Sequence, residues 1–245
     1  MYMLDMSRLY HWFHNYYCSF YSSDLEIMRM VQLKEKHSIR VANHARELAN
    51  SIGLSPEQAE VAEVIGLLHD ISRGEQAHFK TFNDAISFDH GDRGVLRLEE
   101  AGVLDTFDCD EQEIILFAIK YHNKMTIPNA SPEKMQYARI IRDADKLDIF
   151  RILPPVLAHH NYSSLLVELL RKGGVLPYTE VKTLADKRLI RIGWFYDINY
   201  QWTLTQLINE GYAEQLIGAL PNTPLFNEIK DGFRAYVSAK LSMNS

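Results

Sequence analysis

Hydrophobic residues along the chain recur mostly at intervals of three and four positions, which is the pattern of helices with one buried face. A first helix is expected to begin at the capping pair Ser23-Asp24 and to end near Gly53. A second is expected from Ser55, whose side chain can cap it while Gln58 completes a capping box. This second helix should run through an apolar stretch to residues 69 and 70.

Three further helices are predicted before residue 154. The next helix should start at Asp89, another should be capped by Asp110, and a third should restart after Ser131. Residues 72–88 show no clear period, and residues 123–131 contain a proline. Both segments are therefore expected to be irregular.

The pair Pro154-Pro155 is the best internal boundary of the chain. We expect an N-terminal segment at 1–22, a helical bundle at 23–153 and an aromatic-rich helical region at 154–245 that packs with the bundle as one unit. His159-His160, just after the break, is expected at the surface. No stretch alternates apolar and polar residues for long enough to propose a strand, so the predicted fold class is all-α.

The composition is that of an ordinary globular protein. Of 245 residues, 47% are hydrophobic and 24% are charged, and the formal net charge of -6 argues against a broad basic surface for duplex nucleic acid. The two cysteines, Cys18 and Cys109, stand in no paired motif, so neither a disulfide framework nor a thiolate zinc site is expected. The N-terminus lacks a signal-peptide pattern, and no stretch approaches the ~20 apolar residues of a membrane span. We expect a cytoplasmic protein without a membrane partner.

Several histidines and aspartates within this helical pattern are candidate metal ligands. Six residues of metal-ligating type are spread along the chain: His37, His69, Asp70, His90, His122 and Asp145. Imidazole nitrogen and carboxylate oxygen together suit a divalent cation. Because His69 and Asp70 are consecutive, about 100° apart around a helix, they can aim at one metal only from a helix end or if Asp70 turns across the site. The two oxygens of Asp70 would also allow it to bridge two metals.

Each of these residues also has a purely structural interpretation. His37 alone could be a core histidine, and Asp145 could be an ion-pair partner on a helix face. His90 could belong to a helix cap, and His122 could cap a helix C-terminus, where a cation is favoured. The ordered set, rather than any single residue, therefore indicates a metal site.

The order of these motifs resembles the HD-domain superfamily of metal-dependent phosphohydrolases. Residues 66–71 (GLLHDI) are similar to its central motif and residues 141–147 (IRDADKL) to its closing motif, and the resemblance covers roughly residues 33–150. It implies an all-α HD-domain bundle at 23–153 with a C-terminal helical extension packed on it. It also implies four protein ligands of a first metal: His37, His69, Asp70 and Asp145.

The resemblance further implies a second metal. His90 and His122 stand where binuclear members carry extra ligands, so these histidines and a bridging Asp70 would hold it. Two metals ~3.5–4 Å apart can hold a hydroxide and clamp both the attacking and the leaving oxygen. The implied reaction is hydrolysis of a phosphate mono- or diester, in a small phosphorylated substrate such as a nucleotide, by a metal-bound hydroxide. Manganese, iron, nickel, zinc or magnesium could serve, and histidine-rich ligation leans away from magnesium alone.

The chain departs from the family pattern beside the His-Asp pair. Some members carry a glutamate base there, whereas this chain has Arg73, whose planar guanidinium can bind phosphate oxygens. Lys124 and Lys146 are the other candidate catalytic cations beside Asp70, although Lys146 could equally form an ion pair with a neighbouring aspartate. The Gly-Tyr-Pro signature of cyclic-dinucleotide phosphodiesterases is absent, so that substrate is not supported.

Two other functions stay open on the same residues. A di-iron oxygenase uses a similar set of six ligands and would consume oxygen with an organic substrate. A non-catalytic sensor would bind a nucleotide and signal through the C-terminal helices, although the intact ligand set disfavours it. The aromatic C-terminal third is the candidate face for a homodimer, while the sequence names neither the substrate nor the oligomeric state.

Overall fold

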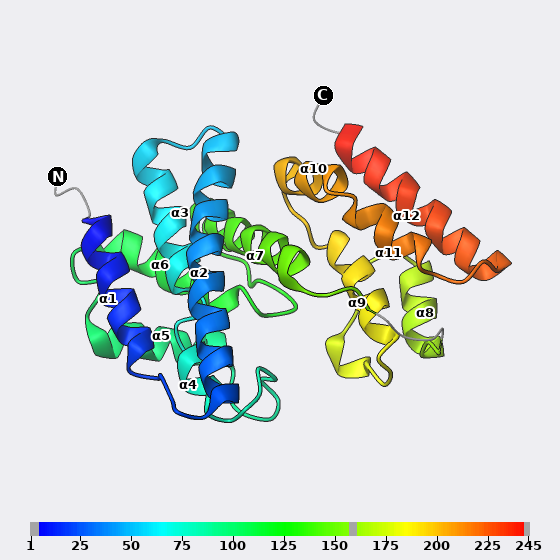
Figure 1. Cartoon of the computed structure of the whole chain (residues 1–245). Coiled ribbons are helices and arrows are strands. Elements are labelled where there is room, and N and C mark those ends of the chain that lie inside the picture. Colours follow the sequence, from blue (N-terminus) through cyan, green and yellow to red (C-terminus); the bar gives the residue numbers. More distant parts are fainter. Residues whose placement is uncertain (1–4, 157–160, 243–245) are drawn as a thin grey trace. The chain divides into compact units, whose positions relative to one another are not determined.

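The computed structural model describes residues 5–156 and 161–242, and over these residues every regular element is a helix. The predicted all-α fold class is confirmed. The chain divides into two compact units, an N-terminal unit of residues 1–148 and a C-terminal unit of residues 149–245 (Figure 1). The surface position expected for His159-His160 concerns residues outside the described part, and the packing of the C-terminal region on the bundle stays a prediction.

The described residues of the N-terminal unit form seven helices, the last of which continues to residue 152. They are α1 (Met6–Cys18), α2 (Leu25–Ser51), α3 (Pro56–Leu68), α4 (Arg73–Ala77), α5 (His90–Ala101), α6 (Cys109–Tyr121) and α7 (Pro132–Ile152). Helix α2 packs along α3 and reaches α4, while α6 packs against both α3 and α5 (Figure 1). Burial of the apolar faces holds this bundle together, because the side chains at its centre exclude water. Fully or almost fully buried residues include Val31, Val41, Leu48, Ile65, Leu67, Leu68, Ile115, Ile119 and Ile141.

Side-chain caps explain why the helices begin where they do. The Asp24 carboxylate accepts hydrogen bonds from two backbone amides of the first turn of α2. Ser55 and Gln58 form the predicted capping box of α3, and Asp89 caps α5. These caps satisfy amides that have no partner inside the helix. The predicted starts of α2, α3 and α5 are therefore confirmed.

Two local predictions were wrong. The cap of α6 is Asp108 rather than Asp110, because Asp108 and Glu111 already form a reciprocal capping box and place Asp110 inside the first turn. The segment 72–88 is not irregular throughout, since it contains the five-residue helix α4. A helix of little more than one turn is too short to produce a hydrophobic period that the sequence could reveal.

Two glycines allow helices to approach closely beside the predicted site. A Cβ atom on Gly66 of α3 would lie 2.6 Å from the Cα atom of Ala42 on α2. A Cβ atom on Gly91 of α5 would lie 2.7 Å from the carbonyl oxygen of Lys120 on α6. Because packed atoms do not tolerate such distances, both contacts require the absence of a side chain. The two helix pairs therefore pack backbone to backbone.

The C-terminal unit is a second helical bundle. After the end of α7 it contains α8 (Ser164–Arg171), a short 3₁₀ helix (Tyr178–Glu180), α9 (Asp186–Phe195), α10 (Gln201–Asn209), α11 (Tyr212–Gly218) and α12 (Pro224–Ser242). Helix α9 packs against α8 and α11, and α12 packs against α8 and α10 (Figure 1). Among the described residues, no helix combines the length and the apolar character needed to cross a membrane.

Candidate metal centre

The six predicted ligands come together inside the N-terminal unit although five helices carry them. His37 lies in the middle of α2, and His69 and Asp70 lie at the C-terminal end of α3. The remaining three are the first residue of α5, the C-terminal cap of α6 and a position on α7: His90, His122 and Asp145. The helix end at residue 69 is what lets two consecutive side chains face one site.

One side of the site gathers around the Oδ2 atom of Asp70. This oxygen lies 3.6 Å from the Nε2 atom of His37 and 3.4 Å from the Nε2 atom of His69. The Oδ1 atom of Asp145 lies 3.0 Å and 3.7 Å from the same two nitrogens. Two nitrogens and two carboxylate oxygens of different residues therefore converge on one point.

The other side gathers around the Oδ1 atom of Asp70. This second oxygen lies 3.4 Å from the Nε2 atom of His90 and 3.8 Å from the Nε2 atom of His122. The two histidine nitrogens are themselves 2.9 Å apart. Asp70 thus presents one oxygen to each pair of histidines, and its side chain is almost completely buried between them. This is the arrangement that a bridging carboxylate requires.

The Nδ1 atom of every one of these histidines faces a hydrogen-bond acceptor. In His69 and His122 the acceptors are backbone carbonyls of the preceding helical turn, at 2.8 Å and 2.6 Å. In His37 and His90 the acceptors are the carboxylates of Asp148 and Asp84, both at 2.6 Å. An Nδ1–H that donates outward leaves Nε2 with its lone pair, as in histidines that bind metals. All four rings are therefore set to offer Nε2 to the centre.

Two observations show that the donor set fits divalent cations. The Nε2 atom of His69 is buried and has no hydrogen-bond partner among the described residues. The Nε2 atoms of His90 and His122 face each other as two acceptors at 2.9 Å, a contact that needs a positive charge to be favourable. Imidazole nitrogen with carboxylate oxygen is a donor set for transition-metal ions. The Nε2 atom of His69 is thus a ligand atom without a hydrogen-bond partner among the described residues.

The pKa values on the first side favour a bound positive charge. Burial alone would raise the pKa of Asp70, but Lys34, His69 and Arg73 hold it well below its usual range. Burial alone would lower the pKa of His69, yet the Asp70 and Asp145 carboxylates outweigh it and raise the pKa to about 9. Without a metal this ring is protonated near pH 7, and metal binding would displace the proton from its Nε2 atom. Asp145 keeps a pKa well below the usual range because His37 and His69 overcome the effect of its burial. The carboxylates are therefore ionised and attract a cation at this point.

The second pair of histidines behaves differently. Burial and the charge of Arg73 lower the pKa of His90 to about 3, although Asp84 opposes the shift. Burial also lowers the pKa of His122, against the effect of Asp70. Both rings are therefore neutral near pH 7, which is the protonation state in which imidazole binds a metal.

Two cations contact the central carboxylate, and the sequence pointed to only one of them. Arg73 donates from Nε to Asp70 at 3.2 Å, and its other nitrogens contact His90 and the loop that carries Asp84. Lys34 donates from Nζ to Asp70 at 2.6 Å, with 14% of its side chain exposed. Lys34 stands one turn before His37 on α2, a spacing that could have singled it out.

The other two predicted catalytic cations have partners of their own. Lys124 is held by the carboxylates of Asp89 and Asp92 at the start of α5. Lys146 donates to the carbonyl of Arg142, one turn earlier on α7, at 3.3 Å. Neither contact tests a role in phosphate binding, so that role stays a prediction for both lysines.

Two aspartates that orient histidines were not singled out as site residues. Asp148 is fully buried, accepts from His37 and also receives two hydrogen bonds from Arg40. Asp148 follows Asp145 by three positions and so shares its helix face, which was a usable signal. Asp84 lies in the segment that was expected to be irregular, and no periodic pattern marks it. Hydrogen bonding by His90 and the charge of Arg73 hold the pKa of Asp84 below its usual range despite burial, and hydrogen bonds from His37, His44 and Arg40 do the same for Asp148.

The sequence of this chain was compared with models of known protein families. Residues 35–149 match the family model described as HD domain. That range contains all six converging residues and ends at the junction of the two units. Searches of curated proteins and of solved structures returned no match to this chain.

Proposed function

We propose that this chain, which belongs to the HD-domain superfamily through residues 35–149, hydrolyses a phosphate mono- or diester with the help of two divalent metal ions. The superfamily consists in general of metal-dependent hydrolases, and this chain has the buried histidines and aspartates that can hold metal. One observation carries the proposal: the two oxygens of Asp70 face two separate histidine pairs.

The proposed ligands fall into two sets that share Asp70. His37, His69 and Asp145 would complete the first set, and His90 and His122 would complete the second. Bound metal ions would supply Lewis acidity, which activates water at neutral pH and stabilises negative charge on phosphate oxygens. Histidine-rich ligation favours manganese, iron, nickel or zinc over magnesium alone.

The chain's own cations would complete the electrostatics. Lys34 is the best placed to bind a phosphate oxygen, because its ammonium already approaches the site from a partly exposed position. We propose that Lys34 donates to the substrate phosphate, while Arg73 orients Asp70 and His90 through the contacts described above. Donors fixed before the reaction stabilise developing charge without reorganisation. Lys124 and Lys146 stay candidates for binding further phosphate oxygens.

The proposal is tested by metal analysis and a substrate screen on the same protein preparations. Protein purified without added metal should contain two metal ions per chain and should hydrolyse at least one member of a panel of phosphomonoesters, phosphodiesters and nucleotides. The double variant His69→Ala, Asp70→Ala should lose both properties, while His11→Ala, which removes an exposed histidine of α1, should keep them. Circular dichroism checks that both variants are folded. If the double variant is not folded, the single variant Asp70→Asn replaces it.

Other outcomes would point elsewhere. Full metal content and full activity in the double variant would refute the proposed site. Oxygen consumption with iron bound, and no hydrolysis, would support the oxygenase alternative on the same ligands. Tight nucleotide binding without turnover in the metal-loaded protein would support the sensor alternative.

A further inference from the structure

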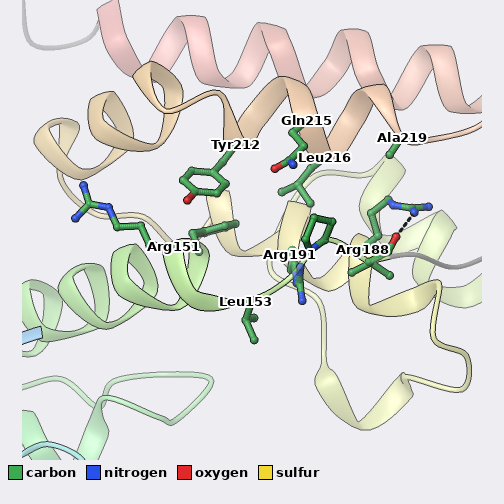
Figure 2. A pocket seen from close by; sticks show the side chains of 11 residues that line it. Arg151, Leu153, Arg188, Arg191, Tyr212, Gln215, Leu216 and Ala219 are labelled. Carbon is green, nitrogen blue, oxygen red and sulfur yellow. Dashed lines mark hydrogen bonds between the residues drawn. The ribbon is translucent and has the colours of Figure 1, made fainter. Parts of the chain in front are cut away.

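The C-terminal unit contains a cavity of about 370 Å³ that no predicted metal ligand lines. Its walls come from the end of α7, the segment that follows it, α9 and α11 (Figure 2). Apolar side chains form part of the wall, including Phe150, Leu153 and Leu216. Arg188 and Arg191 of α9 form another part, with Gln215 of α11 above them (Figure 2). Small-molecule sites are typically cavities of roughly 300–1,000 Å³ with a few polar groups in an apolar wall.

Arg188 is a buried cation that has no carboxylate within ion-pair distance in the described part of the chain. Only 5% of the residue is exposed, and its guanidinium donates to the hydroxyl of Tyr162 and to the carbonyl of Val156. Both partners are uncharged, and the two bonds use two of the five N–H donors of the group. A buried charge is costly unless an opposite charge accompanies it. A bound anion beside Arg188 would therefore stabilise this buried charge.

Arg191, which is partly buried, places a second positive charge beside Arg188. It stands three positions after Arg188 and so shares its helix face, and its guanidinium donates to the carbonyl of Pro154 at 2.7 Å. Burial lowers the pKa of Arg191, the Tyr178 phenol opposes this, and the charge of Arg188 lowers it further.

Among the residues that the structure describes, no acidic side chain forms an ion pair with Arg188 or Arg191. Across residues 5–156 and 161–242, no carboxylate lies within ion-pair distance of Arg188 or Arg191, and residues 157–160 contain no acidic residue in the sequence. The contrast within the same cavity wall is Arg151, which is paired with Glu210. Two neighbouring guanidinium groups with unused donors match the planar oxygens of a carboxylate or phosphate.

We propose that this cavity is a binding site for a small organic anion, with a carboxylate or phosphate group on Arg188 and Arg191 and an apolar part against Phe150 and Leu216. The amide of Gln215, from the opposite helix, is placed to accept or donate one further hydrogen bond to the polar part of the ligand. This site goes beyond the proposed hydrolase activity, because its residues all belong to the C-terminal unit and none is a candidate metal ligand.

The test is isothermal titration calorimetry of the full chain with phenylphosphonate, benzoate and the neutral analogue benzyl alcohol. Each probe is measured on the wild type, on Arg191→Gln and on Lys187→Gln. Lys187 is an exposed residue of α9 that does not line the cavity, so its variant removes one positive charge from the same helix. Any binding of phenylphosphonate to the metal centre is common to both variants, and only the difference between them reports on the cavity.

We expect Arg191→Gln to weaken binding of at least one anion roughly tenfold relative to Lys187→Gln, and we expect benzyl alcohol to bind far more weakly than the anions. Loss of phenylphosphonate binding alone identifies a phosphate ligand, and loss of benzoate binding alone identifies a carboxylate. Equal affinities in the two variants, equal binding of the neutral analogue, or no binding to the wild type would overturn the proposal. Arginine side-chain Nε resonances give a second measurement, since those of Arg188 and Arg191 should shift with the bound anion.

Discussion

The Nδ1 atom of His37 and the Oδ2 atom of Asp148 lie 2.6 Å apart in the interior of the N-terminal unit, where both side chains are fully buried. The carboxylate fixes the ring of His37 and directs its Nε2 atom toward Asp70 and Asp145. A carboxylate behind a histidine also makes the imidazole a stronger metal ligand. This pair is therefore part of the candidate centre, although Asp148 itself would not touch the metal.

The variant Asp148→Asn should weaken metal binding about tenfold or more, because an amide oxygen can still accept from His37 but brings no negative charge. Competition with a chromophoric chelator measures the dissociation constant. The control is Arg40→Gln, which removes another partner of Asp148 and leaves the contact with His37 in place. Identical dissociation constants in Asp148→Asn and the wild type would show that the charge behind His37 does not matter for binding.

The number of bound metals can be assigned to the two histidine pairs. The variant His90→Ala should retain about one metal ion per chain, because among the described residues His90 groups with Asp70 and His122 and not with the ligands of the first set. Asp70→Ala should lose both ions, since each set depends on one of its oxygens. Inductively coupled plasma mass spectrometry provides the count. A wild-type protein with a single ion would reject the binuclear arrangement and would return His90 and His122 to a structural role.

Much of this architecture was readable from the sequence, and for a physical reason. Caps such as Asp24 and Ser55 act on amides two or three residues away, so a short motif contains all the information that fixes the helix start. The candidate ligands that come together in the structure could be selected from the sequence, because a helix end at His69 and single ligands in separate motifs form a recognisable order. Asp108 and Asp110 are both suitable capping residues two positions apart, and the sequence did not show which carboxylate would cap the helix.

What escaped the sequence depends on contacts between distant residues. Lys34 meets Asp70 and Asp148 meets His37 only after α2, α3 and α7 have packed. The spacing of Lys34 and Asp148 from candidate ligands on their own helices indicated a shared face, but it did not indicate these partners. The same is true of the cavity in the C-terminal unit. Arg188 stands in an ordinary amphipathic helix, and only the fold reveals that its charge is buried with no acidic partner among the described residues.

The close approach of α2 and α3 can be tested through Gly66. The variant Gly66→Ala should lower the free energy of unfolding by about 1–3 kcal/mol, because the new methyl group would meet the backbone of Ala42 and force the helices apart. The matched control is Gly232→Ala on α12, where a Cβ atom would have no neighbour within 4 Å. Urea unfolding should show the control to be unchanged or stabilised by up to ~1 kcal/mol. Equal stability of the two variants would mean that the helices are not in backbone contact.

Asp186 should contribute pH-dependent stability to the C-terminal unit. Burial raises the pKa of Asp186. Hydrogen bonds from Ser163 and from the amides of Lys182 and Thr183 lower this pKa by more than burial raises it, so the folded-state pKa lies below the ordinary value. A carboxyl of this kind stabilises the fold above its unfolded pKa of about 3.9, and the stabilisation disappears as the pH falls through the folded-state pKa.

The variant Asp186→Asn should therefore lower the free energy of unfolding at pH 7 by about 1–2 kcal/mol, since the amide nitrogen cannot accept the bonds that the carboxylate accepts. The difference from the wild type should shrink when the pH is lowered below about 4. Urea titrations followed by tryptophan fluorescence measure it, with the exposed Asp231→Asn as control. A difference that stays constant down to acid pH would indicate that ionisation of Asp186 is not the source of the stabilisation.

The role of Lys34 can be separated from metal binding. The variant Lys34→Gln should keep the full metal content, because the ammonium is not a ligand, and should lower kcat/KM on the phosphoester found in the screen by about 10–100-fold, the loss expected for one charged hydrogen bond to phosphate. Lys36→Gln is the matched control, since Lys36 lies two positions away on α2 and is exposed. An increase in KM alone would mean that Lys34 contacts the phosphate equally in the bound substrate and in the transition state. An equal fall in kcat and kcat/KM would mean that the contact forms only in the transition state. If the two variants behave alike, the contact of Lys34 with Asp70 is structural, and another cation must neutralise the phosphate.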